Sequence, residues 1–111
     1  MKIKKINRKF KVGKKHKVTI TEVASIKLKS NEQIVFSEKN KKYDFVKKNW
    51  GYYATPSMNF RLKKNGYRSA IIINKEKRLY LFVIDKNKIR SFKRYCLSHK
   101  LKVYMWLDIF K

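Results

Sequence analysis

The sequence is poor in residues that cross-link or interrupt a chain, and it is poor in acids. Its 111 residues include one cysteine, one proline, three glycines and seven acidic residues. The single Cys96 excludes an internal disulfide framework and a zinc site built from thiolates. With only His16 and His99 beside it, and so few carboxylates, the sequence predicts no metal and no other cofactor.

Long apolar stretches are also missing. No run approaches the roughly 18 to 20 residues that a transmembrane helix needs. The basic start of the chain lacks the continuous apolar core of a secretory signal. We therefore expect a soluble, cytoplasmic protein without a transmembrane segment, and the length suits one core but not two.

Positive charge is the property in excess. Lysine and arginine number 31 against seven acids, which gives a formal net charge of +24. A content of 43% hydrophobic and 14% aromatic residues is too apolar for a disordered basic tail, so the chain should fold. A basic folded domain attracts polyanions, which makes nucleic acid or another anionic molecule the expected partner.

The lysine excess has a second explanation in codon usage. Phe, Tyr, Met, Ile, Asn and Lys have AT-rich codons and make up more than half of the chain. A coding sequence that drifts toward AT gains lysine wherever a solvated side chain is tolerated. The arginines fit this explanation less well, because their planar, bidentate guanidinium cannot be replaced by lysine. They are Arg8, Arg61, Arg68, Arg78, Arg90 and Arg94.

Two regions are predicted, a basic arm over residues 1–17 and a single α+β domain over residues 18–111. The arm carries nine cations and no acid. The spacing of Ile3, Ile6 and Phe10 would allow an amphipathic helix on a polyanion or an anionic lipid surface. The alternative is a solvated terminus, or an edge strand that docks on the body.

Strands are expected from the β-branched and alternating residues that follow the arm. Residues 26–29 should pair with residues 33–37 across the turn at 30–32, and a further strand should cover residues 43–47. Thr55 and Pro56 suit the start of a short helix over residues 58–65, which Gly66 would end.

The second half of the chain continues this alternation. Residues 67–74 and 79–84 are predicted strands, residues 86–100 a helix capped by Asp85, and residues 101–107 a last strand. The predicted fold class is therefore α+β: an N-terminal β-hairpin followed by a ferredoxin-like β-α-β-β-α-β antiparallel sheet with two helices on one face. Strict alternation in the last strand would put Tyr104 and Trp106 on one side, as a stacking platform or a second small core.

Two groups of residues are candidate binding sites. The first is predicted to bind nucleic acid by point charges on the arm and on the last helix; its members are Lys4, Lys5, Arg8, Lys9, Lys86, Arg90, Lys93 and Arg94. The second could hold a small anion with hydroxyl, amide and guanidinium donors; its members are Trp50, Thr55, Ser57, Asn59 and Arg61. The alternatives are a solvated helix face for the first and a well-capped helix for the second.

No motif indicates catalysis. The two histidines lack an obvious partner for general acid–base chemistry, and Cys96 falls on the apolar side of its predicted helix. Tyrosine, lysine and arginine can act in enzymes, so the sequence leaves the question of an enzyme open while offering no catalytic residue.

The segment Trp50-Gly51-Tyr52-Tyr53-Ala54-Thr55-Pro56-Ser57, followed by Asn59, Arg61 and Leu62, resembles a family of short uncharacterised bacterial proteins. Asn31-Glu32-Gln33-Ile34 and the ending Trp106-Leu107-Asp108 are similar to it too, so the resemblance covers about residues 18–108. It implies a link to surface-sugar gene neighbourhoods and brings no assigned activity.

The sequence thus favours a small non-enzymatic domain that binds a polyanion through the arm and the last helix. RNA is favoured over DNA as this polyanion. The competing hypothesis is an accessory protein that binds a protein or a small anion through residues 50–61, with a link to surface-sugar biosynthesis. A homodimer through an edge strand or an open sheet face is a further expectation, because small sheet domains often pair in this way.

Overall fold

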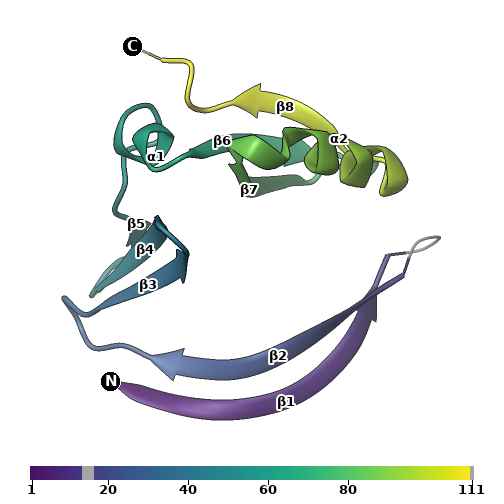
Figure 1. Ribbon diagram of the computed structural model, residues 1–111. Helices are drawn as coiled ribbons and strands as arrows, with labels where there is room; N and C mark the ends of the chain where they lie inside the picture. The colour runs from purple at the N-terminus through teal and green to yellow at the C-terminus, as the bar shows by residue number, and fades with distance from the viewer. Residues whose placement is uncertain (14–16, 111) are drawn as a thin grey trace.

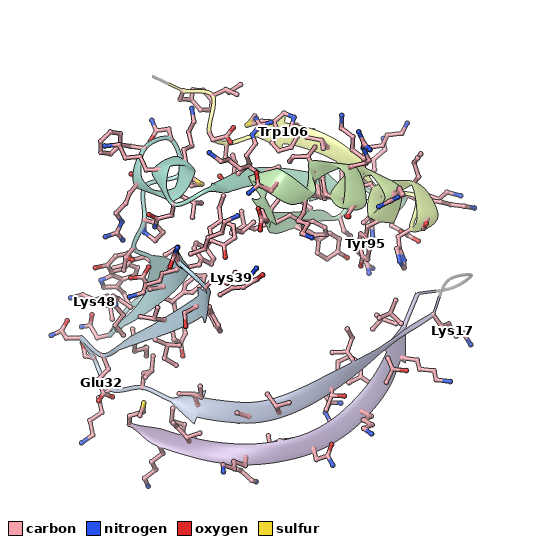
Figure 2. All side chains as sticks on the ribbon, in the orientation of Figure 1. Lys17, Glu32, Lys39, Lys48, Tyr95 and Trp106 are labelled. Atoms are coloured by element: carbon pink, nitrogen blue, oxygen red, sulfur yellow. The ribbon has the colours of Figure 1, made fainter. Side chains whose placement is uncertain are left out.

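The computed structural model describes residues 1–13 and 17–110 (Figure 1). The fold is α+β, as predicted, with antiparallel strands in three separate sheets and two α-helices. The elements, in chain order, are β1 (Lys2–Val12), β2 (Val18–Lys27), β3 (Gln33–Glu38), β4 (Lys41–Lys48), β5 (Gly51–Ala54), α1 (Arg61–Lys64), β6 (Tyr67–Ile73), β7 (Leu79–Asp85), the 3₁₀ turn η1 (Lys86–Lys88), α2 (Ile89–Ser98) and β8 (Lys102–Trp106).

The first sheet is a long hairpin of β1 and β2. The predicted basic arm is its first strand, apart from residues 14–16, which lie outside the described residues. The described part of the arm is therefore extended and not helical. The predicted pairing of residues 26–29 with 33–37 is wrong, because β2 pairs with β1 along its length. In Figure 1 the hairpin is a curved ribbon along one side of the molecule.

The second sheet is a meander in the order β3-β4-β5. Its strands β3 and β4 were predicted, whereas β5 was not, because it has only four residues. Helix α1 is also shorter than predicted. Its N-cap position is Phe60, without a side-chain cap, so the predicted N-cap at Thr55 is wrong. Gly66 follows the helix in the left-handed region, with φ of 90°, as predicted.

The third sheet and α2 contain the main core of the protein, and we call β6–β8, η1 and α2 the core module. The sheet order is β7-β6-β8, and in Figure 1 α2 lies across one face of this sheet. Phe92 and Cys96 of α2 pack against the buried side chains of the central strands. The cluster consists of Ala70, Ile72, Ile84, Phe92 and Cys96, with Phe82, Ile89, Leu101 and Trp106 at its margin.

The ferredoxin-like sheet is not shown. The predicted β-α-β-β-α-β order begins with the strand over residues 43–47, which is β4. The chain adds the unpredicted strand β5 before α1, and β6, β7, α2 and β8 then follow in the predicted order. A ferredoxin-like sheet would unite the four predicted strands, but β4 pairs with β3 and β5 in the second sheet, and β8 pairs with β6. The order of most elements along the chain was therefore predictable, whereas their assembly into sheets was not.

An irregularity in β8 changes which side chains share a face. Ile71 pairs with Met105 and Ile72 with Val103, so one residue of β8, Tyr104, is extra. Trp106 consequently turns to the α2 face, where its ring lies 6.2 Å from the ring of Phe92. Tyr104 stays 60% exposed. The predicted alternation in this strand is wrong, and Tyr104 and Trp106 do not form a joint platform.

Two ion pairs hold the sheets and the end of the chain in place. Lys41 of β4 forms an ion pair with Asp85 at the end of β7, and the Lys41 side chain lies against Gly66. These contacts join the second sheet to the core module. Arg68 donates two hydrogen bonds, of 2.8 and 3.0 Å, to the buried carboxylate of Asp108.

The chain exposes far more surface than a compact monomer of its size. Its accessible surface is 9152 Å², about 2,600 Å² more than the surface that a typical monomer of 13.5 kDa exposes. The radius of gyration is 15.7 Å, against about 13 Å for a compact domain of this length. Within the described ranges, no helix is long and apolar enough to cross a membrane.

Candidate nucleic-acid interface

The hairpin of β1 and β2 has two chemically different faces. Because side chains alternate along a strand, the pairing of β1 with β2 assigns each residue to a face. We call the first the polar face; it carries Lys2, Lys4, Lys9, Lys11, Thr19, Thr21, Val23, Ser25 and Lys27. The second, the apolar face, carries Ile3, Lys5, Arg8, Phe10, Val12, Val18, Ile20, Glu22, Ala24 and Ile26.

The polar face combines five lysines with hydroxyl groups and holds no carboxylate. Its lysines are exposed, and none forms an ion pair with another described residue. Lysine ammonium groups bind phosphates as point charges, and threonine and serine hydroxyls can donate to phosphate oxygens. The arrangement suits a linear array of phosphates.

The bulge in β1 divides the predicted arm residues between the two faces. The register shifts between Lys5 and Arg8, so Lys4 and Lys9 lie on the polar face while Lys5 and Arg8 lie on the apolar face. Arg8 donates a 2.7 Å hydrogen bond to Glu22 and lies 4.7 Å from the ring centre of Phe10. Two of the four predicted arm residues therefore lie on the face opposite the lysine row.

A second cationic surface surrounds a hollow of about 630 Å³ at the start of α2. All four residues predicted for this helix line it, together with Lys88; they are Lys86, Arg90, Lys93 and Arg94. The nearby carboxylate of Asp85 is occupied, because it accepts from Lys41 and from the backbone N–H of Asn87. These bonds hold the pKa of Asp85 below its ordinary value.

Aromatic rings line a larger cavity, of about 740 Å³, between the end of β1 at Val12 and Gly13 and the far end of α2. Tyr80, Tyr95 and His99 contribute rings to it, and Val12 borders it from the hairpin. The rings of Tyr95 and His99 lie 4.2 Å apart. Such exposed rings can stack on unpaired bases. Sequence reasoning missed Tyr95 and His99, although their spacing of four residues places them on one side of a helix.

The residues of the predicted small-anion site are mostly engaged with one another. Arg61 donates from Nη2 to Thr55 Oγ1 at 2.8 Å, and the same nitrogen lies 3.9 Å from Asp44. Ser57 Oγ accepts from the Arg61 backbone N–H, and Asn59 donates to the carbonyl of Phe110. Hydrogen bonds among Thr55, Ser57 and Arg61 stabilise the loop before α1. Anion binding by these residues stays a prediction.

Trp50 differs from the other members of that group. Its ring stacks on Tyr53, with ring centres 6.1 Å apart and planes 17° apart, and it is 68% exposed. The stacked pair is an exposed aromatic surface at the edge of the second sheet.

Metal binding and thiol chemistry find no supporting geometry. In residues 1–13 and 17–110, no three histidine, cysteine or acidic side chains gather as a metal site. Cys96 is buried in the core, and burial raises the pKa of its thiol, which disfavours the reactive thiolate.

No protein-family model matches the chain, and no curated protein or solved structure is significantly similar to it. The resemblance carried by residues 50–62 therefore stays a prediction. The two cationic surfaces and the aromatic cavity are the features of the molecule that point to a function.

Proposed function

We propose that this chain binds single-stranded RNA through the polar face of the hairpin and the cationic hollow of α2. The observation that carries the proposal is the row of five lysines on the polar face, without a carboxylate to neutralise them. A row of this kind along a strand gives a phosphate backbone repeated contacts, and each contact releases counterions.

The aromatic cavity supplies the feature that favours RNA over duplex DNA. A base that stacks on Tyr95 or His99 must be unpaired, because the faces of paired bases are covered by their neighbours. The end of β1 at Val12 and Gly13 borders the same cavity, so a strand that leaves the polar face at this end of the hairpin could continue into it. Base stacking adds about 1 to 3 kcal/mol per base without requiring a particular sequence.

The test compares two triple variants with the same net charge. The first changes Lys4, Lys9 and Lys11 of the polar face to glutamine; the control changes the exposed Lys39, Lys42 and Lys63 elsewhere. Binding to a pool of unstructured RNA is measured by fluorescence anisotropy over a range of salt concentrations. We expect the polar-face variant to lose about 2 units of the slope of log affinity against log salt concentration, and the control to lose almost none.

Equal losses in both variants would contradict the proposal, because the affinity would then follow total charge and codon drift would suffice to explain it. Undetectable binding of the unmodified chain at low salt would contradict it as well. A Tyr95→Ala variant separates the two parts of the site: it should weaken binding by about 1 to 3 kcal/mol and leave the salt slope unchanged.

A further inference from the structure

The apolar face of the hairpin is uncovered. Ile3, Val12 and Ile20 are 56%, 39% and 40% exposed. Apolar residues alternate with polar residues along both strands, so these side chains share one face of the hairpin. Among the described elements, only isolated contacts reach the hairpin from outside it. A lone two-stranded hairpin is marginal in water, so this one needs a cover for its apolar face.

The sheet of the core module has an uncovered apolar face too. Its residues are those whose register places them opposite to the α2 side, and we call this the open face. It comprises Tyr67, Ser69, Ile71, Ile73, Leu79, Leu81, Val83, Asp85, Lys102 and Met105, of which Ile71, Ile73, Leu79, Leu81, Val83 and Met105 form an aliphatic patch. Leu79, Leu81 and Met105 are 55%, 51% and 42% exposed. An aliphatic patch across three strands is typical of a surface that packs against another sheet.

The area of surface that a partner would have to cover can be estimated. The surplus of about 2,600 Å² over a compact monomer is more than one partner contributes to an ordinary protein complex. Two copies that each covered this surplus would bury about 5,000 Å² in total, which lies in the range of obligate homodimers. The surplus also explains the large radius of gyration, because an arm that clasps another molecule must extend from its own body.

Both uncovered faces belong to the same chain, and they are complementary in kind. Each is a β surface of aliphatic side chains with few charges. The apolar face holds Lys5 and the mutually paired Arg8 and Glu22, and the open face holds Lys102 and Asp85, which is paired with Lys41. The phosphate backbone of RNA could not cover such faces, whereas a second copy supplies one for each. A dimer with two-fold symmetry covers the apolar face and the open face of both chains at once.

We infer that two copies of this chain form a clasped homodimer, in which the apolar face of each hairpin packs on the open face of the partner's core module. The polar faces of the two hairpins then point away from the interface. The dimer presents two lysine rows, and formation of the interface leaves the surface available for a polyanion.

The test is the mass of the unmodified chain and of paired variants in sedimentation experiments. The unmodified protein is expected at twice 13.5 kDa at micromolar concentration. Ile20→Arg on the apolar face should weaken the dimer by about 100-fold, because it places an unpaired charge in the interface. Val23→Arg is the matched control on the same strand; its side chain is 67% exposed on the polar face, and it should not affect the mass.

Leu81→Arg gives an independent check from the core module. Leu81 is half-exposed in the single chain, so the variant should fold, and the mass should fall as it does for Ile20→Arg. The control in the same module is Leu97→Arg, at an exposed position of α2. Circular dichroism of each variant shows whether it has folded. If Leu81→Arg folds and remains dimeric, the open face is not the interface and the inference is wrong.

Salt separates this inference from the proposed function. Each chain carries +24, so salt screens the repulsion between copies and should strengthen the dimer, while it weakens RNA binding. A monomer that binds RNA would overturn the dimer alone. A dimer that ignores RNA would overturn the function alone. An unmodified chain that remains monomeric at high salt contradicts the inference and leaves a different protein as the cover of these faces.

Discussion

The hairpin of β1 and β2 and the core module are built from similar residues, yet only one of them has a core. The core module brings α2 against its sheet and buries Ile72, Phe92 and Cys96. The hairpin alternates apolar and polar residues equally well and buries none of its side chains fully. Alternation of apolar and polar residues along a strand therefore shows that one face of the sheet is suited to burial. Whether the same chain covers it depends on what lies within reach.

The charges differ between the two regions in the same way. In the core module Arg68 is fixed by Asp108 and stacks on Trp106, 3.7 Å from the ring centre. On the polar face of the hairpin, lysines stand without carboxylates among the described residues. The first arrangement stabilises a fold, and the second leaves positive charge available for a ligand.

The largest difference between the regions should appear when an aromatic side chain is removed from each. Phe92→Ala is expected to destabilise the core module by about 3 to 5 kcal/mol, because it leaves a cavity under the sheet. At protein concentrations low enough for the chain to be monomeric, Phe10→Ala on the hairpin should change the same transition by less than about 1 kcal/mol, because no partner then covers the apolar face. Urea unfolding followed by the fluorescence of Trp106, in chains in which Trp50 is replaced by phenylalanine, measures both, and equal effects would show that the two regions unfold as one unit.

Two of the arginine–carboxylate pairs, Arg68 with Asp108 and Arg8 with Glu22, provide the next comparison. Asp108→Asn removes the charged partner of Arg68 in a buried position and should destabilise the core module by about 2 to 3 kcal/mol. Glu22→Gln breaks the exposed pair with Arg8 and should have an effect below about 1 kcal/mol. Urea titrations of both variants give the two values. The titrations are made at dilutions at which the chain is monomeric, and a large effect of Glu22→Gln there would mean that the hairpin packs on its own chain.

Acid should weaken the core module through the same pair. Hydrogen bonds from Arg68 hold the pKa of Asp108 below its ordinary value of 3.8. A carboxylate with a lowered folded pKa contributes stability that is present above the unfolded value and lost as the pH falls through the folded value. We therefore expect the urea midpoint to fall as the pH drops below 3.8, and to fall less steeply in Asp108→Asn. Parallel curves would contradict the assignment.

The smallest predicted effect concerns single lysines on opposite faces of the hairpin. Lys9→Gln on the polar face should reduce the salt slope of RNA binding by about 0.7, the value for one phosphate contact on a single strand. Lys5→Gln, with the same change in charge on the apolar face, should leave the slope unchanged. Anisotropy titrations at several salt concentrations distinguish the two, and identical slopes would mean that the hairpin faces are equivalent for RNA.

Sequence reasoning predicted the local elements well and their partners poorly. The strands β6 and β7, the cap of Asp85 and the two buried residues of α2 follow from periodicity and capping, which act over a few residues. Strand partners do not follow, because β2 could close a hairpin with either neighbour. The bulge at Tyr104 was also invisible, and this one residue sends Trp106 into the core.

The candidate site was predictable in part for the same reason. A helix face is fixed by the 3.6-residue period, so Lys86, Arg90, Lys93 and Arg94 do surround one hollow. On β1 the prediction treated Lys4, Lys5, Arg8 and Lys9 as one patch, but a strand with a bulge divides neighbours between two faces. The cavity at Tyr95 and His99 depends on where the end of β1 at Val12 and Gly13 lies relative to α2, which no local pattern encodes.

Amide hydrogen exchange across a dilution series tests the central claim most directly, because it reads both regions in one experiment. If a second copy covers the hairpin, protection of the β1 and β2 amides should fall on dilution, while protection of β6 should stay constant until the module itself unfolds. Hairpin protection that does not change with protein concentration would contradict the clasped dimer and, with it, the account of why this chain leaves so much apolar surface uncovered.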